Sequence, residues 1–134
     1  NSDAPWSCPV LLLAEREADG RVIRCRGQAM GAFIIDTDDP LNAGESYGFR
    51  FEGDTQAARI LDVRVDTKDR NDLLITCDKP PQGKDLTLCY AVGYPASNDG
   101  MPANRGALRD SFGYVSATGR MLHRWALPAA LPVH

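Results

Sequence analysis

Several residues between positions 94 and 125 carry side chains that could recognise a polar ligand. The segment from residue 95 to 106 is dense in Pro, Gly, Asn and Asp, which indicates a long loop of the kind that is often functional. Asn, Asp and Arg direct hydrogen bonds, while an aromatic ring beside them supplies apolar area. This combination suits a sugar ligand. The candidate glycan-binding residues are Tyr94, Asn98, Asp99, Asn104, Arg105, Tyr114 and Trp125.

Arg109, Asp110 and Ser111 follow this loop and are interpreted as loop-structuring residues. Such side chains can hydrogen-bond backbone groups that an irregular segment leaves unpaired. The alternative is a hydrolase in which Ser111 is the nucleophile and His123 the base. We favour a packed, hydrogen-bonded His123, because an extended strand would place it on the same face as Trp125. We therefore predict no catalytic residue.

Motifs for other kinds of chemistry are missing from the sequence. It has no phosphate-binding glycine loop, no H-E-x-x-H, no nucleophile elbow and no paired cysteines at metal spacing. The acidic turn at residues 36–39 lacks the glycine and the closing glutamate of an EF-hand loop. We expect no cofactor and no metal.

Charge and hydropathy exclude two classes of partner. The net charge is −3 with both signs interspersed, which gives no electrostatic reason to propose nucleic acid or an anionic membrane. No apolar run approaches the roughly 18 residues that a membrane span needs. We expect neither nucleic acid nor membrane as a partner.

Short apolar runs separated by turn residues predict the elements that position these side chains. Asp19-Gly20 between two such runs indicates a β-hairpin, and a helix over residues 10–18 is the alternative for its first strand. The expected strands are residues 10–16, 21–26, 30–35, 47–52, 60–65, 73–77, 86–93 and 121–127.

This pattern predicts an all-β domain over residues 10–134, built as a two-sheet β-sandwich. A jelly roll is the expected topology and an immunoglobulin-like sandwich is the alternative. We expect residues 1–9 to form an extended N-terminal arm or linker. We interpret Trp6 as an anchor that packs on the sandwich; the alternative is a disordered end.

Tyr47, Phe49 and Phe51 alternate with polar residues and are predicted to share one strand face. Three rings on one face could form a platform for a sugar. We favour the core interpretation, because large aromatic side chains more often bury their area inside a domain.

The four cysteines, Cys8, Cys25, Cys77 and Cys89, allow three disulfide pairings that the sequence cannot choose between. Three of them lie in apolar strand patterns, where buried free thiols are common. We favour free thiols, and an extracellular location would reverse this preference.

An ordered set of residues in the C-terminal part of the chain resembles a known β-domain. The residues are Leu88, Tyr90, Ala91, Gly93, Arg105, Gly106, Leu108 to Ser111, Leu122, His123, Trp125 and Ala126. Their order resembles the C-terminal β-domain that follows the catalytic domain in SGNH-type carbohydrate esterases, including sialate O-acetylesterase-like proteins, and in related phage or prophage tail proteins. The resemblance is diffuse before residue 86.

The resemblance implies an accessory module and not a catalytic one. The family's nucleophile turn is Gly-Asp-Ser, but Arg109 precedes Asp110-Ser111 here. The family's Asp-x-x-His is also missing, because Arg120 and Leu131 stand three residues before the two histidines. The implied partner is an upstream catalytic domain of the same polypeptide, and the implied location is extracellular or in a phage virion.

Two functions from different classes follow. In the first, the chain is a carbohydrate-binding module that contacts a glycan through the long loop. In the second, it is a structural module that packs subunits as a homo-oligomer or caps a catalytic domain. A stand-alone hydrolase is the third and least supported alternative, because it needs contact between Ser111 and His123.

Overall fold

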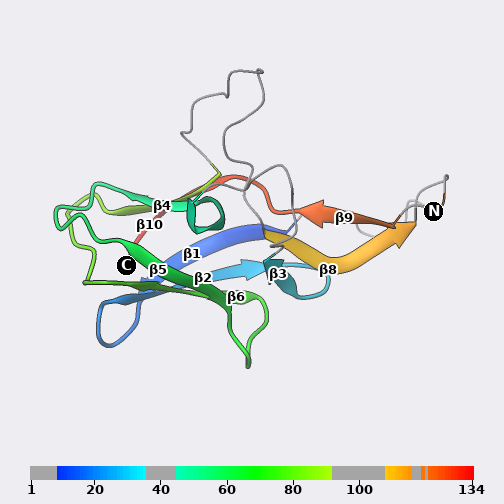
Figure 1. Ribbon diagram of the computed structural model, residues 1–134, viewed down its shortest axis with the longest axis horizontal. Helices are drawn as coiled ribbons and strands as arrows, with labels where there is room; N and C mark the ends of the chain where they lie inside the picture. Colours follow the sequence, from blue (N-terminus) through cyan, green and yellow to red (C-terminus); the bar gives the residue numbers. More distant parts are fainter. Residues whose placement is uncertain (1–8, 36–44, 92–107, 116–118, 120) are drawn as a thin grey trace, which may run out of the picture.

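The protein is built from β-strands arranged in three antiparallel sheets (Figure 1). The computed structural model describes residues 9–35, 45–91, 108–115, 119 and 121–134; for Glu45, 112–115 and 121–125 it describes the backbone alone. The elements are β1 (Val10–Arg16), β2 (Val22–Gln28), β3 (Phe33–Ile35), the 3-10 turn η1 (Glu45–Gly48), β4 (Phe49–Glu52), β5 (Ile60–Val65), β6 (Asp72–Cys77), β7 (Thr87–Tyr90), β8 (Leu108–Val115), β9 (Met121–Trp125) and β10 (Ala129–Pro132).

The largest sheet has the strand order β1-β2-β6-β5. Its first hairpin confirms the Asp19-Gly20 prediction, because β1 pairs with β2 in antiparallel register and Gly20 adopts a positive φ of 74° in the turn. Residues 10–16 form a strand, so the helix alternative is wrong. β6 lies between β2 and β5, as its nearly continuous apolar sequence indicates.

The other two sheets have three strands each, in the orders β10-β7-β4 and β3-β8-β9. Figure 1 shows the β10-β7-β4 sheet facing the four-stranded sheet on the left of the view. β8 and β9 extend away from these two sheets toward the right. The all-β prediction is confirmed, and the two facing layers are consistent with a β-sandwich. Jelly-roll connectivity stays a prediction.

One hydrophobic core joins the two facing layers. The inward side chains of the four-stranded sheet, such as Ile23 and Leu73, and those of the opposite sheet, such as Phe49 and Tyr90, are almost fully buried. The rings of Phe49 and Tyr90 are 4.8 Å apart at 47°. Aromatic pairs in such tilted geometry stabilise beyond the area they bury.

Backbone hydrogen bonds join the two layers along one side, which we call the closed seam. A parallel bridge connects Ala14 of β1 with Val133 just after β10. On either side of it, the Arg16 N–H donates to the His134 carbonyl and the His134 N–H donates to the Ala14 carbonyl, both at 2.9 Å. The order of strands around the molecule therefore runs from β5 through β1 and β10 to β4.

Two side chains differ from the sequence prediction. Tyr47 lies in η1 and not in a strand, because Ser46 and Tyr47 have positive φ angles of 53° and 58°. Regular strand alternation over residues 60–65 would place Leu61 on the inward face with Val63, but Leu61 is 62% exposed. The cause is a β-bulge between Ile60 and Asp62, which shifts the register by one residue.

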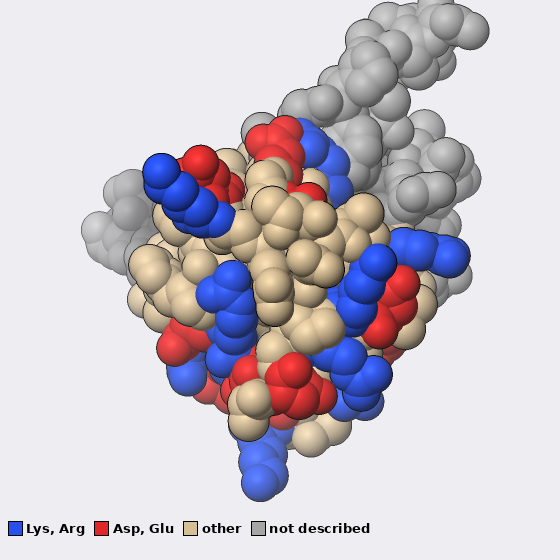
Figure 2. All heavy atoms as spheres, turned by 90° about the vertical axis from the view of Figure 1, so that its left-hand side faces the viewer, with Lys and Arg blue, Asp and Glu red and all other residues tan. Residues whose placement is uncertain are grey.

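The outer face of the four-stranded sheet carries an ion-pair network around Arg24. Its guanidinium contacts Glu17 at 2.7 Å, Asp66 at 2.7 Å and Asp72 at 2.9 Å. Arg26 approaches the same Asp72 carboxylate at 3.6 Å. Side chains of both signs are also interspersed on the end of the molecule drawn in Figure 2. No helix in the described residues is long and apolar enough to cross a membrane.

Candidate ligand-binding groove

The side of the sandwich opposite the closed seam is open. β4 and β5 are the edge strands of the two facing sheets, and they flank a groove of about 880 Å³. This volume falls in the range of roughly 300–1,000 Å³ that is typical of small-molecule sites. We call the space between β4 and β5 the open seam. Its lining residues are Ser46, Tyr47, Phe49, Arg50, Phe51, Gly53, Asp54, Ala57, Ala58, Arg59, Ile60, Leu61, Asp62 and Val63.

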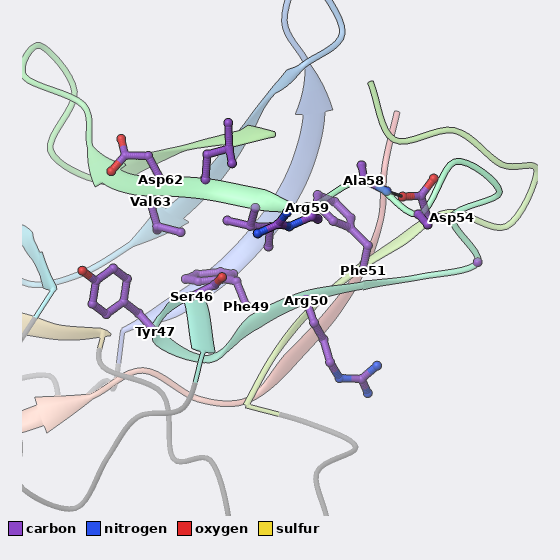
Figure 3. A pocket seen from close by; sticks show the side chains of 14 residues that line it. Ser46, Tyr47, Phe49, Arg50, Phe51, Asp54, Ala58, Arg59, Asp62 and Val63 are labelled. Carbon is purple, nitrogen blue, oxygen red and sulfur yellow. Dashed lines mark hydrogen bonds between the residues drawn. The ribbon is translucent and has the colours of Figure 1, made fainter. Parts of the chain in front are cut away.

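Aromatic rings form one wall of the groove. Figure 3 shows Tyr47, Phe49 and Phe51 directed from η1 and β4 toward β5. Phe49 is buried in the core, whereas Tyr47 and Phe51 are half-buried and pack against the core at its border. The core interpretation is therefore right for Phe49, while the other two rings present part of their surface to the groove.

A cationic side chain lies beside these rings. Figure 3 shows Arg59 next to Phe51 in the space between the two strands, and Arg59 is exposed. Its backbone is fixed to Asp78, whose carboxylate accepts the Arg59 N–H at 2.8 Å. The Arg59 guanidinium forms no hydrogen bond or ion pair with any residue that the structure describes. Its donors are therefore available to a ligand.

Two other charged residues of the lining are directed elsewhere. Arg50 points away from the groove in Figure 3 and forms an ion pair with Glu52 at 2.7 Å. Asp62 lies on the opposite side of β5 from Val63 in the same view. Of Arg50, Arg59 and Asp62, Arg59 is therefore the one best placed to contact a ligand.

The turn before β5 is organised by Asp54. Its carboxylate accepts the backbone N–H groups of Gln56 at 2.9 Å, Ala58 at 2.7 Å and Gln82 at 3.0 Å. Burial alone would raise the pKa of Asp54, but these three backbone bonds and nearby Lys79 together lower it. The carboxylate therefore serves to hold the 54–58 turn in place, with its oxygens occupied.

Strained backbone concentrates at the groove. Ser46, Tyr47, Ala57 and Ala91 are the described non-glycine residues with positive φ, and the first three of them line the groove. Left-handed backbone at a residue with a Cβ costs on the order of 1–2 kcal/mol. Such strain often gathers at binding and active sites, which makes the groove a candidate site.

The structure also shows what Asp110 and Ser111 do. The fully buried Asp110 carboxylate accepts the N–H groups of Met30 and Gly31, both at 2.9 Å. Ser111 Oγ accepts the N–H of Ala32 at 2.8 Å. The two side chains thus fix the segment between β2 and β3 against β8. Arg109 donates to the carbonyl of Asp110 at 3.2 Å.

A second buried anchor joins the described residues that flank the long loop. The Tyr90 hydroxyl accepts the Leu108 N–H at 2.9 Å. Burial raises the pKa of Tyr90 to about 12, and the contact with Leu108 opposes this shift. The hydroxyl therefore stays protonated and acts as a structural link between β7 and β8.

The predicted glycan-binding residues are not tested by these observations. Tyr94, Asn98, Asp99, Asn104 and Arg105 lie outside the described residues, as do Trp6 and the acidic turn at residues 36–39. Tyr114 and Trp125 lie on β8 and β9, but their side chains are not described. Their proposed roles stay predictions.

The described cysteines, Cys25, Cys77 and Cys89, are buried free thiols. Burial, together with nearby Asp72 for Cys25 and Asp78 for Cys77, raises the pKa values of these two thiols to about 12 and about 11. Such thiols are unreactive at neutral pH. Within the described ranges, His, Cys, Asp and Glu side chains form no group of three or more that could hold a metal ion.

Comparisons with protein-family models, curated proteins and solved structures find no match.

Sequence reasoning pointed to the long loop and did not identify the groove. Tyr47, Phe49 and Phe51 gave a signal, since a sugar platform was considered for them, but strand alternation assigned all three to one buried face. The turn at Ser46 and Tyr47 breaks that alternation. Arg59 carried no signal, because its position beside the rings depends on how two distant strands face each other.

Proposed function

We propose that this chain is a non-catalytic glycan-binding module and that the groove between β4 and β5 is its site. The observation that carries the proposal is the combination of half-buried Tyr47 and Phe51 with the available guanidinium of Arg59. An aromatic ring covers the apolar face of a sugar, and a guanidinium donates hydrogen bonds to its hydroxyls or carboxylate. Because the groove is open along the strands, it suits an oligosaccharide.

The surface charge agrees with this ligand class. Basic and acidic side chains alternate on the face drawn in Figure 2, so no field of one sign dominates there. The strained η1 turn presents Tyr47 at the groove, which fixes the ring before a ligand arrives. A fixed ring loses little conformational freedom on binding and therefore favours affinity.

The context suggested by the family resemblance is part of the same proposal. The module would follow an SGNH-type esterase domain or belong to a phage tail protein, and it would hold a glycan near that neighbour. Tyr94 and Arg105, which lie outside the described residues, stay candidates for a second glycan contact.

The experiment is a glycan array on the parent chain and on three variants, all shown to be folded by circular dichroism. Arg59→Gln removes the available cation, and Arg16→Gln is its control, because Arg16 is an exposed arginine on β1 outside the groove. The Tyr94→Ala, Arg105→Ala double variant tests the loop. We expect Arg59→Gln to weaken binding at least about tenfold, since a hydrogen bond from a charged group contributes about 1.5–3 kcal/mol.

Two outcomes would reject the groove as the site. If the loop variant loses binding while Arg59→Gln binds like the parent, the site is the loop. If the folded parent binds no glycan on the array, a structural module is favoured instead. One observation already favours that second function, namely that the edge strands β4 and β5 have no further strand beside them among the described residues.

A further inference from the structure

The free edge of β5 has backbone groups that no described residue pairs. The Asp66 N–H donates to the Asp72 carbonyl at 2.9 Å, which makes residues 66 and 72 a hydrogen-bonded pair of the β5–β6 ladder. Such pairs alternate along an antiparallel ladder, so residues 62 and 64 also bond to β6. The N–H and C=O groups of Val63 and Val65 therefore point outward from the sheet.

The side chains along this edge have a self-complementary order. Asp62 and Arg64 flank Val63 symmetrically, and both are exposed. Neither forms an ion pair with any residue in the described part of the chain. Leu61, which the bulge leaves 62% exposed, stands two positions before Val63, and the partly buried Val65 stands two positions after it.

We propose that β5 pairs with β5 of a second copy of this chain, antiparallel and centred on Val63. In this register the outward backbone groups of Val63 bond to those of the partner's Val63. Asp62 of each copy then faces the other copy's Arg64 in a non-hydrogen-bonded pair, the position where cross-strand side chains are closest. Leu61, which the bulge leaves without a partner on β6, marks the end of the regularly paired segment. The two four-stranded sheets become one continuous sheet.

Other symmetric registers are less favourable. A pairing centred on Asp62 would place two aspartates opposite each other, and one centred on Arg64 would place two arginines opposite each other. Like charges directly opposite on neighbouring strands are destabilising. The charge order of β5 therefore selects the register centred on Val63, and with it a second copy as the occupant of this edge. The inference does not rest on glycan binding, although Leu61, Asp62 and Val63 also line the groove.

The test uses the charge order, since Asp62 and Arg64 are exposed and can be exchanged without disturbing the core. Sedimentation velocity of the parent from about 1 to 200 µM should show a monomer–dimer equilibrium. Asp62→Arg alone, or Arg64→Asp alone, places like charges opposite each other and should weaken the dimer at least about tenfold. The double variant Asp62→Arg, Arg64→Asp restores both pairs and should dimerise like the parent.

A mixture of the two single variants gives a second, register-specific readout. Each single variant repels its own copy but complements the other, so an equimolar mixture should form a heterodimer. Arg21→Asp, an exposed substitution away from β5, serves as the control and should leave the dimer unchanged. A chain that stays monomeric over the whole range, or a dimer that neither single variant weakens, would overturn the proposal. A monomer that instead captures unrelated extended peptides on β5 would overturn it as well.

Discussion

The two seams of this sandwich differ in how their strands meet. At the closed seam, β1 and the end of β10 are joined by backbone hydrogen bonds, and Ala14 is fully buried there. At the open seam, β4 and β5 flank a groove whose rim includes an exposed leucine and an available guanidinium. The same core supports both seams. The difference leads us to propose that the closed seam serves stability and that the open seam is left for a ligand or a partner.

Ala14 is fully buried at the closed seam. We expect Ala14→Leu to destabilise the protein by about 1–3 kcal/mol, because overpacking a buried site forces neighbouring strands apart. Ala130→Leu is the matched control, since Ala130 is exposed on β10 at the same seam, and it should stay within about 0.5 kcal/mol of the parent. Urea unfolding monitored by circular dichroism measures both. Equal effects of the two substitutions would show that the seam is not tightly packed.

The Arg24 network should make stability sensitive to acid, independently of the open seam. Hydrogen bonding to Arg24 lowers the pKa of Asp66. The backbone hydrogen bonds in the 54–58 turn likewise help to lower the pKa of Asp54. A carboxyl with a depressed folded-state pKa stabilises the protein above its unfolded pKa and loses this effect as the pH falls through the folded value. Stability should therefore fall between about pH 5 and pH 2.

The variant Arg24→Gln distinguishes the contribution of Asp66 to this acid sensitivity from that of Asp54. At pH 7 it should cost about 1–3 kcal/mol, because the 5% exposed Asp72 carboxylate keeps only the longer contact with Arg26. The variant should also lose less stability on acidification than the parent, since Asp66 then has no partner to depress its pKa. Urea unfolding at pH 7 and pH 3 measures this. An unchanged acid dependence would mean that Arg24 is not the source of the Asp66 shift.

The strain at the open seam predicts a smaller effect of opposite sign. Ala57→Gly should stabilise the protein by up to about 1 kcal/mol, because glycine adopts the positive φ of 51° without a Cβ penalty. Ala130→Gly, on a regular strand, should instead destabilise by roughly 0.5–1 kcal/mol. Thermal unfolding compares the two. Destabilisation at both positions would show that the groove turn stores no strain.

The sequence predicted the local elements better than the site. Short apolar runs and Asp19-Gly20 were enough to place β1, β2, β5 and β6, because strand patterning and turn chemistry act over a few neighbours. β8 and β10 were missed as strands, since Arg109, Asp110 and Ser111 were interpreted only as loop-structuring residues and β10 contains Pro132.

The features that the sequence did not predict depend on contacts between residues far apart in the chain. Arg24 meets Asp66 and Asp72 only through the register of β2 on β6, which no local pattern fixes. The groove likewise needs a left-handed turn at Tyr47 and a bulge at Leu61, and neither residue type favours that geometry. Such departures from local preference occur where the structure around them compensates for the strain.

The most direct test of the glycan site is an NMR titration of the isotope-labelled chain with the strongest oligosaccharide from the array. We predict that the amide shifts concentrate at η1, β4 and residues 57–63, and that Arg59→Gln removes them while Arg16→Gln leaves them intact. Amide shifts confined to residues outside the groove, and present equally in the Arg59→Gln variant, would contradict the account. The long loop would then be the favoured site.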